Sequence, residues 1–200
     1  MVYLYMKFVP RSESTRNFII ETTAEVFNKK GYAGTSIADL EKITKLTKGS
    51  IYGNFENKEQ VALAVFDYNL DRVHHKVKEG VAKSSGYKAK ILSYLTTYAG
   101  LQNTGGCPMQ NTGVEADDTH EGLRERAAAG FLKWKEDLVN LINGGIGANE
   151  FKAGTDAEKV SIMFISLIEG GILMSRTTRN RAYFETVIGL AKDAIGTICI

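Results

Sequence analysis

The stretch that decides the fold is residues 15–66, TRNFIIETTAEVFNKKGYAGTSIADLEKITKLTKGSIYGNFENKEQVALAVF. Its apolar residues recur at the three- and four-residue spacing of a helix with one buried face. Two lysines and then Gly31 follow the first such run, which suits a helix that ends with cations and a left-handed residue. The predicted buried face of this first helix consists of Phe18, Ile19, Thr22, Thr23, Val26 and Phe27.

Two further short helices are predicted on either side of the turn Thr44-Lys45-Leu46. Thr35 or Ser36 can cap the first of them, and Thr47 can cap the second. Two short helices joined by a tight turn form the helix-turn-helix arrangement, here from Ser36 to Phe55. The apolar side of the earlier helix is expected to consist of Ile37, Leu40 and Ile43.

The later of these two helices has an inward and an outward side. Ile51 and Phe55, four residues apart, should face the other helices, which leaves small and polar residues outside. Such residues suit DNA, because hydroxyls and a lysine reach phosphates or base edges and a glycine allows close approach. These outward residues are Thr47, Lys48, Gly49, Ser50, Tyr52 and Asn54. Asn57 can cap a fourth helix, with Gln60 as its capping-box partner, which would point Lys58 at the same DNA backbone.

This segment resembles the N-terminal DNA-binding domain of the TetR/AcrR family of bacterial repressors. That family reads approximately T-S-x-x-x-I-A-x-x-A-G-V-S-x-G-x-[IL]-Y-x-[HY]-F-x-x-K-x-x-L, and residues 35–61 read TSIADLEKITKLTKGSIYGNFENKEQV. The matching residues include Thr35, Ser36, Gly49, Tyr52, Phe55 and Lys58. The resemblance implies that residues 47, 48, 50 and 52 contact an operator, and that Lys58 with Thr35 or Ser36 holds phosphates. Gly53-Asn54 departs from the family pattern, so we expect a more flexible end of the recognition helix and an unusual base preference.

Composition and charge narrow the class of protein. The 200 residues are 44% hydrophobic with a net charge of +2, and residues 1–60 carry nine Lys and Arg against seven Asp and Glu, again +2. DNA binding must therefore depend on where the charges lie. No apolar run approaches the roughly 18 residues of a membrane span. The apolar start MVYLYMKFVP is broken by Pro10 and lacks the core of a signal peptide. We expect a cytoplasmic protein with no membrane contact and no cofactor.

The sequence predicts an all-α fold with two domains. A helix-turn-helix domain is expected at 12–72, and the resemblance implies a C-terminal ligand-binding and dimerisation domain at 73–200. Helices are expected at about 57–80, 87–103, 119–146, 156–176 and 181–198, with a loop rich in helix breakers at 104–108.

The last two predicted helices are the expected dimer surface. Residues 156–176 are apolar nearly all round, which indicates burial on more than one side. Gly170-Gly171 costs on the order of 1 kcal/mol of helix propensity per residue, which close approach of a partner helix would explain. The resemblance implies a four-helix bundle between two subunits, which would hold two recognition helices about 34–36 Å apart; an intramolecular core is the alternative. The candidate interface consists of Leu167, Gly170, Gly171, Phe184, Ile188, Ala191 and Ile195.

A small-molecule pocket is expected in the C-terminal domain, although plain core packing is the alternative for each of its residues. The candidate lining consists of Tyr94, Tyr98, Cys107, Met109, Phe131, Trp134, Met163 and Phe164. The histidines at 74, 75 and 120 lack the spacing of metal ligands, so no metal site is predicted.

Residues 106–118, GCPMQNTGVEADD, contain a G-C-[LP]-x-x-N-x-x-x-E motif. The motif recurs in a branch of TetR-like proteins that includes electrophile- and redox-responsive repressors. Cys107 is expected in a flexible loop where a thiolate could be reached, but the acidic residues that follow would raise its pKa. A sensing thiol and a small residue packed under the pocket both remain open. Cys199 lies too far along the chain to indicate a disulfide framework.

Taken together, the sequence favours a dimeric DNA-binding transcriptional regulator, a repressor that a small-molecule effector releases from double-stranded operator DNA. One alternative is a redox-sensing repressor that acts through Cys107. Another is a small-molecule-binding protein or an enzyme that uses the C-terminal cavity, although no catalytic triad, phosphate loop or metal cluster supports catalysis.

Overall fold

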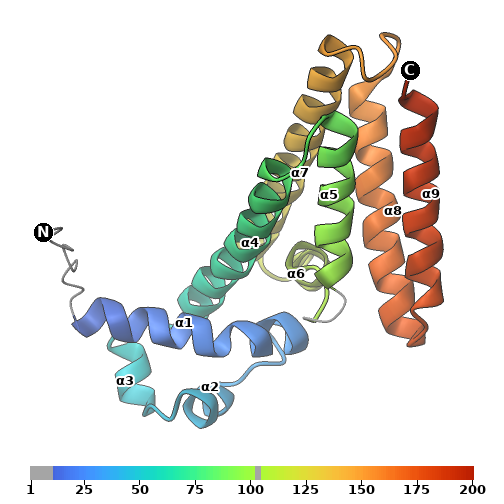
Figure 1. The fold of residues 1–200 in the computed structure, drawn as a ribbon. Coiled ribbons are helices and arrows are strands. Elements are labelled where there is room, and N and C mark those ends of the chain that lie inside the picture. The colour runs from blue at the N-terminus through green and yellow to red at the C-terminus, as the bar shows by residue number, and fades with distance from the viewer. Residues whose placement is uncertain (1–10, 102–104) are drawn as a thin grey trace, which may run out of the picture.

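The computed structural model describes residues 11–101 and 105–200, whose regular secondary structure is helical apart from one isolated bridge between Phe151 and Cys199 (Figure 1). The predicted all-α class is confirmed. The helices are α1 (Arg11–Lys30), α2 (Ile37–Thr44), α3 (Lys48–Tyr52), α4 (Lys58–Ala82), α5 (Tyr87–Ala99), α6 (Pro108–Ala116), α7 (Glu121–Gly147), α8 (Ala157–Thr178) and α9 (Ala182–Ile198). The apolar start of the chain, residues 1–10, and the start of the predicted loop, Thr104, lie outside the described residues. Within the described ranges, no helix has the length and apolar character to cross a membrane.

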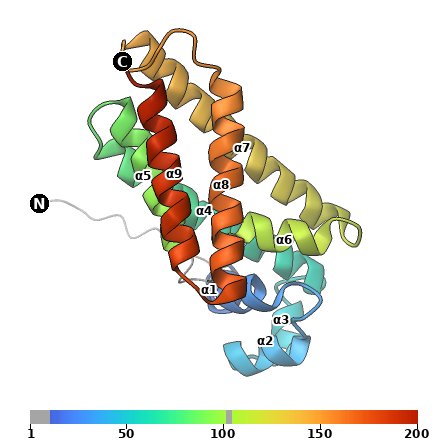
Figure 2. The same ribbon diagram turned by 90° about the vertical axis from the view of Figure 1, so that its right-hand side faces the viewer.

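Two hydrophobic clusters organise the helices, and α4 belongs to both. The N-terminal cluster joins α1, α2 and α3 to the first turns of α4, around residues such as Leu40 and Ile51. The C-terminal cluster takes the rest of α4 and packs it with α5 to α9, around residues such as Phe164 and Ile168. Figure 1 shows α1 lying across the lower end of α4, with α2 and α3 beyond it, while α4 rises obliquely into the bundle. In Figure 2, α8 and α9 lie side by side on the face turned to the viewer.

The buried face of α1 differs from the predicted one. Ile20 and Ala24 are buried with Ile19, Thr23 and Phe27, because α1 packs chiefly against α4 as well as against α2. The face is therefore rotated toward α4. Two residues that were predicted to face inward are exposed: Phe18 of α1 is 46% exposed and Ile43 of α2 is 36% exposed.

Helix α6 was missed, since a loop was predicted at 104–108 and the next helix only from about residue 119. Gly105 and Gly106 do break the chain, with φ angles of 100° and 95° in the left-handed region. Pro108 then occupies the first turn of α6, a position that suits proline because its missing N–H has no partner there anyway. The same proline that indicates a break thus also begins the helix that connects the two clusters.

Candidate nucleic-acid interface and its connection to the C-terminal domain

Both short helices of the helix-turn-helix segment begin at a residue whose side chain caps the helix. Ser36 and Asp39 form a capping box in which Asp39 N donates to Ser36 Oγ (3.1 Å) and Ser36 N donates to Asp39 Oδ2 (2.9 Å). Lys45 ends α2 in the left-handed region, with φ at 60°. Thr47 then caps α3 by accepting a hydrogen bond from Ser50 N (3.2 Å). The caps predicted at Ser36 and Thr47 are confirmed, and they set the direction of α3.

The outward end of α3 carries most of the residues that were predicted to contact DNA. Thr47, Lys48 and Gly49 are exposed, and Ser50, Tyr52 and Asn54 are half-buried around them. A Cβ atom added to Gly49 would meet only the hydroxyl of Thr47, at 3.9 Å, so a ligand can come close to the backbone here. The structure thus brings these six residues together at one accessible end of the molecule, while Ile51 and Phe55 are buried behind them as predicted.

Thr35 and Lys58 have structural roles that the sequence did not reveal. Thr35 is fully buried and its hydroxyl donates to Gly31 O (2.6 Å), so the prediction that its side chain holds a phosphate is wrong. Lys58 Nζ donates to Tyr32 O (2.8 Å) and Thr35 O (3.0 Å) and lies 4.1 Å from the centroid of the Tyr32 ring. In this arrangement Lys58 holds the connection between α1 and α2 against the start of α4. Ser36 remains exposed beside it.

Helix α6 connects the N-terminal cluster to the C-terminal cluster. Its Glu115 carboxylate accepts hydrogen bonds from Tyr32 N and Ala33 N, both at 2.8 Å. These N–H groups follow Gly31, whose φ of 75° confirms the predicted left-handed end of α1. A Cβ atom at residue 31 would overlap the Glu115 carboxylate, so the carboxylate keeps this position only beside a glycine. One carboxylate from α6 therefore binds the segment that leaves α1.

Asn111, one helical turn before Glu115, makes a second set of bonds to α1. Its Nδ2 atom donates to Asn28 O and Gly105 O, both at 2.9 Å. Asn28 Nδ2 in turn donates to Gly106 O (3.2 Å). We call Asn28, Gly106, Asn111 and Glu115 the interdomain contact. Sequence reasoning missed it, although the four-residue spacing of Asn111 and Glu115 after Pro108 would place both on one helix face.

Most of the predicted pocket residues meet in the C-terminal cluster, where they form a packed aromatic core. The rings of Tyr98 and Trp134 stack with centroids 3.8 Å apart, and Tyr94 stacks on Tyr98 at 6.3 Å. Cys107, Met109 and Phe164 are also buried in this cluster, and Phe131 packs at its edge. Met163 is 37% exposed on α8 and does not belong to this cluster. Tyr94 borders a surface groove between α4, α5 and α7.

Glu169 introduces a charge into this core. Among the described residues neither of its carboxylate oxygens has a hydrogen-bond partner, and the same is true of Trp134 Nε1. Burial raises the pKa of Glu169 to about 7, and the nearby Cys107 thiol offsets part of that rise. Within the part of the chain that the structure describes, no group of three metal-ligand side chains is found.

Cys107 is a buried core residue. It is fully buried as the N-cap residue of α6, so the expectation of an accessible thiol in a flexible loop is wrong. Burial raises the pKa of the Cys107 thiol well above its usual range, and the negative charge of Glu169 adds to the rise. Both effects disfavour the thiolate that redox chemistry requires. This arrangement favours the packing role for Cys107.

The candidate dimer residues divide into an inner and an outer group. Gly171, Phe184, Ala191 and Ile195 are buried within this chain. A Cβ atom at Gly171 would come within 3.0 Å of Val187 Cγ1, so this glycine serves the packing of α8 on α9, and the intramolecular alternative is correct for this group. Leu167, Gly170 and Ile188 are partly exposed. Beside them are exposed apolar residues that the sequence reading did not select, namely Ile162, Met163, Leu173, Met174, Tyr183 and Leu190.

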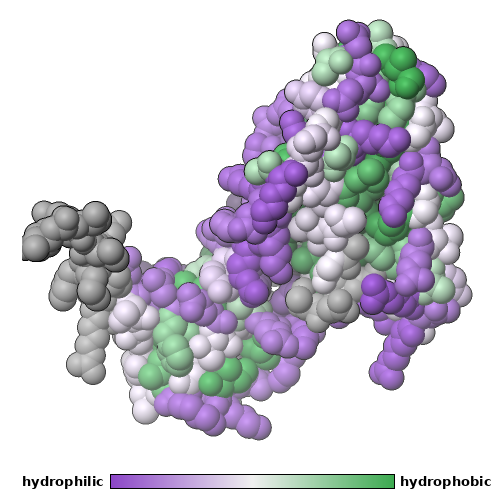
Figure 3. All heavy atoms as spheres, viewed as in Figure 1, coloured by the Kyte–Doolittle hydropathy of each residue, from purple (hydrophilic) through white to green (hydrophobic). Residues whose placement is uncertain are grey.

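This outer group gives the molecule an apolar side and a polar side. Figure 3 shows mostly hydrophilic side chains over α4, and hydrophobic ones among hydrophilic ones over α5 and α9. A Cβ atom added at Gly170 or Gly189 would meet nothing within 4 Å. The outer face of α8 and α9 is therefore both apolar and open to close approach by another helix.

Comparison with known proteins agrees with this geometry. Residues 19–65 match the family described as bacterial regulatory proteins, tetR family, and residues 87–190 match the tetracyclin repressor-like C-terminal domain. A TetR-family transcriptional regulator from Cytophaga hutchinsonii is 47% identical, with a TM-score of 0.91 over 97% of this chain and 99% of that one. A TetR transcriptional regulator from Chloroflexus aurantiacus is 32% identical, with a TM-score of 0.90 over 96% and 98%.

The curated relatives include the transcriptional repressor DhaR of Mycobacterium sp. (strain GP1), 21% identical over 90% of this chain and 91% of its own length. The two family matches fall on the two hydrophobic clusters, and the likeness to solved structures extends over nearly the whole chain. The chain therefore belongs to the TetR family of DNA-binding transcriptional regulators.

Proposed function

We propose that this regulator is a homodimeric repressor that binds double-stranded operator DNA through α3 and releases it when a small-molecule effector binds. The single observation that supports the DNA-binding site best is the exposed end of α3, where small and polar residues surround Lys48 behind a capped turn. Residues 12–72 would provide the DNA-binding domain, and residues 73–200 the effector-binding and dimerisation domain.

The proposed DNA contacts are Ser36, Thr47, Lys48, Gly49, Ser50, Tyr52 and Asn54. They can be tested with DNA from upstream of the protein's own gene, by fluorescence anisotropy over a salt series. Lys48→Gln should weaken binding and reduce the slope of log affinity against log salt by about one, because one phosphate contact is lost. Lys88→Gln on α5, an exposed lysine far along the chain, is the matched control and should change neither quantity.

Tyr52→Ala should also weaken operator binding without changing the oligomeric state, since a phenol at this position can reach a phosphate. If Lys48→Gln and Tyr52→Ala both kept full affinity and the full salt slope, the outward end of α3 would not be the DNA-binding surface. Equal affinity for upstream DNA and for random DNA would contradict operator recognition.

Dimerisation is proposed through the outer face of α8 and α9, which exposes apolar residues around the open Gly170. Leu173 is 55% exposed on this face, whereas Leu132 is 63% exposed on α7. Leu173→Glu should give a monomer in sedimentation-velocity ultracentrifugation, because a charge would be buried in an apolar interface. Leu132→Glu should remain a dimer. A dimer in both variants, or a monomer in both, would refute this interface.

A further inference from the structure

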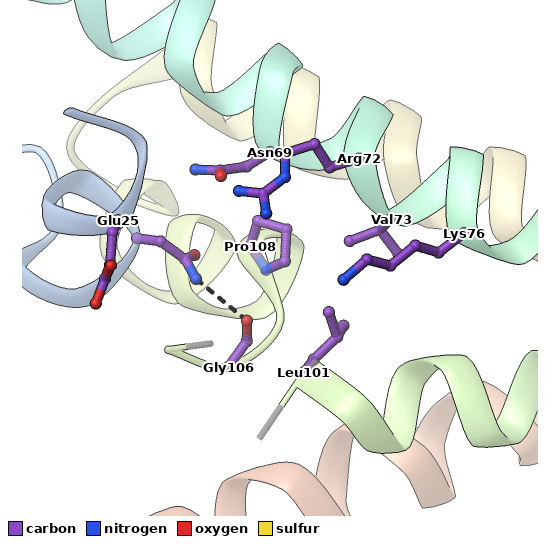
Figure 4. Close-up of a pocket in the computed structure, with 9 residues that line it drawn as sticks. Glu25, Asn69, Arg72, Val73, Lys76, Leu101, Gly106 and Pro108 are labelled. Carbon is purple, nitrogen blue, oxygen red and sulfur yellow. Dashed lines mark hydrogen bonds between the residues drawn. The ribbon is translucent and has the colours of Figure 1, made fainter. Parts of the chain in front are cut away.

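A cleft lies where α1, α4 and the residues before α6 meet, at the junction of the two hydrophobic clusters. Its volume is about 180 Å³. Figure 4 shows that α4 provides one wall, with Arg72 and Lys76, while Gly106 and Pro108 provide another. Asn28, which donates to Gly106 O in the interdomain contact, also lines the cleft. A molecule in this cleft would touch both parts of the protein at once.

The cleft is positively charged. Arg72 and Lys76 lie one helical turn apart, and their terminal groups point toward the cleft (Figure 4). Neither forms an ion pair with any described residue; Arg72 has the Tyr68 ring beside it, with its guanidinium carbon 5.6 Å from the centroid. Glu25 on the opposite wall is paired with Lys29, whose hydrogen bond holds the pKa of that carboxyl below its usual range. Two like charges four residues apart on a helix repel each other, and a bound anion would relieve that repulsion.

The remaining lining is partly apolar, and Asn69 of α4 adds a polar side chain beside Arg72 (Figure 4). Val73, Leu101 and Pro108 are buried residues whose side chains reach the cleft between the two cations and Gly106. A volume of about 180 Å³ is slightly larger than the roughly 150 Å³ of an apolar cavity that accepts benzene. The cleft is therefore matched to a compact apolar body that carries one negatively charged group.

We propose that this cleft binds a small organic anion of the size of an aromatic carboxylate, with its charge on Arg72 and Lys76 and its body on the apolar wall. We assign to this anion the role of an effector, a step that rests on the proposed repressor function. A ligand shifts a conformational equilibrium only by its difference in affinity for the two states. A cleft built from both domains changes shape whenever α1 moves relative to α6, so the bound anion distinguishes the two arrangements.

Binding to the cleft can be tested on the full chain without DNA, by isothermal titration with benzoate as the probe and benzamide as its neutral counterpart. Benzoate should bind saturably, and benzamide at least about tenfold more weakly, since a charge-assisted hydrogen bond is lost. Arg72→Gln and Lys76→Gln should each weaken benzoate binding about tenfold. Lys78→Gln is the matched control, because Lys78 is an exposed lysine of α4 that lines a different groove.

Absence of saturable benzoate binding overturns the proposal, and so does equal binding of benzoate and benzamide. Unchanged benzoate affinity in the Arg72→Gln, Lys76→Gln double variant overturns it as well. A thermal unfolding curve for each variant checks that it is folded.

The effector role is tested by repeating the operator titration with benzoate present. A lower operator affinity that depends on Arg72 and Lys76 supports the role. Saturable benzoate binding with no change in operator affinity overturns the effector role but leaves the anion site. Benzoate binding in a protein that recognises no operator would refute the proposed function, again without removing the site. The two proposals therefore fail separately.

Discussion

The N-terminal and the C-terminal hydrophobic clusters differ in the hydrogen bonding of their buried polar groups. In the N-terminal cluster the hydroxyls of Thr23 and Thr44 donate to Ile19 O and Leu40 O, each at 2.7 Å. In the C-terminal cluster the carboxylate of Glu169 and the indole N–H of Trp134 are buried without a partner among the described residues. Unpartnered buried polar groups cost stability. The C-terminal cluster therefore contains unfavourable buried polar groups of a kind that the described residues of the N-terminal cluster lack.

The largest expected effect is on stability, and it tests whether the two clusters unfold independently. Leu40→Ala removes a fully buried side chain from the small N-terminal cluster and should cost about 2–5 kcal/mol. We expect hydrogen exchange measured by mass spectrometry to rise over residues 11–56 and to stay slow in α8. Leu138→Ala, in the C-terminal cluster, is the matched change and should raise exchange in α7 instead. Equal acceleration in both clusters after Leu40→Ala would show that they unfold as one unit.

Glu169→Gln tests the charge in the C-terminal cluster. The folded-state pKa of Glu169 is raised to about 7 from an ordinary value of 4.5, so ionisation opposes folding. The cost is absent below pH 4.5, where the carboxyl is neutral in both states, grows between pH 4.5 and 7, and is complete above pH 7. The variant should match the wild type at pH 4.5 and exceed its unfolding free energy by on the order of 3 kcal/mol at pH 8.

Urea denaturation at the two pH values measures this difference, with Glu125→Gln as the control because Glu125 is an exposed carboxylate of α7. An identical pH dependence in the wild type and in Glu169→Gln would show that the carboxylate finds a partner in solution.

The variant Lys58→Met tests whether the Lys58 ammonium stabilises the fold or contacts DNA. The change keeps an apolar stem but removes an ammonium that donates to Tyr32 O and Thr35 O, so the N-terminal cluster should lose about 1–3 kcal/mol. The slope of operator affinity against salt should stay that of the wild type, in contrast to Lys48→Gln. A slope reduced by about one in Lys58→Met would mean that its ammonium reaches a phosphate in the complex.

The smallest expected effect concerns the cysteines. Because Cys107 is buried and the pKa of its thiol is raised, iodoacetamide should alkylate Cys199, which is only partly buried, first. Peptide mass spectrometry over a time course measures the two rates. In the presence of hydrogen peroxide, Cys107→Ser should also have the same operator affinity as the wild type. Faster labelling of Cys107 than of Cys199 would favour the redox-sensing alternative.

The features that could be predicted from the sequence are those that depend on neighbouring residues. The caps at Ser36 and Thr47 and the left-handed Gly31 are local, and the structure confirms each one. Which side of each helix is buried could not be predicted in the same way. Helix α8 is apolar nearly all round, so periodicity cannot tell that Phe164 is buried while its neighbour Met163 is exposed.

The interdomain contact was hidden for a related reason. Glu115 binds N–H groups 82 and 83 positions away, and nothing in the local pattern indicates so distant a partner. The motif around Cys107 was therefore interpreted through its most reactive side chain, although its asparagine and glutamate make the contacts to α1.

The Glu115 contact also limits how this regulator can be recombined with others. Its carboxylate fits the N–H groups of Tyr32 and Ala33 only because residue 31 is a glycine. Each domain therefore contributes one side of this contact. A chimera that joins this DNA-binding domain to the C-terminal domain of another regulator would keep this contact only if that domain supplies an equivalent carboxylate. Exchange of domains between such proteins is therefore a matter of compatible pairs, with residues 31 and 115 as the pair to inspect first.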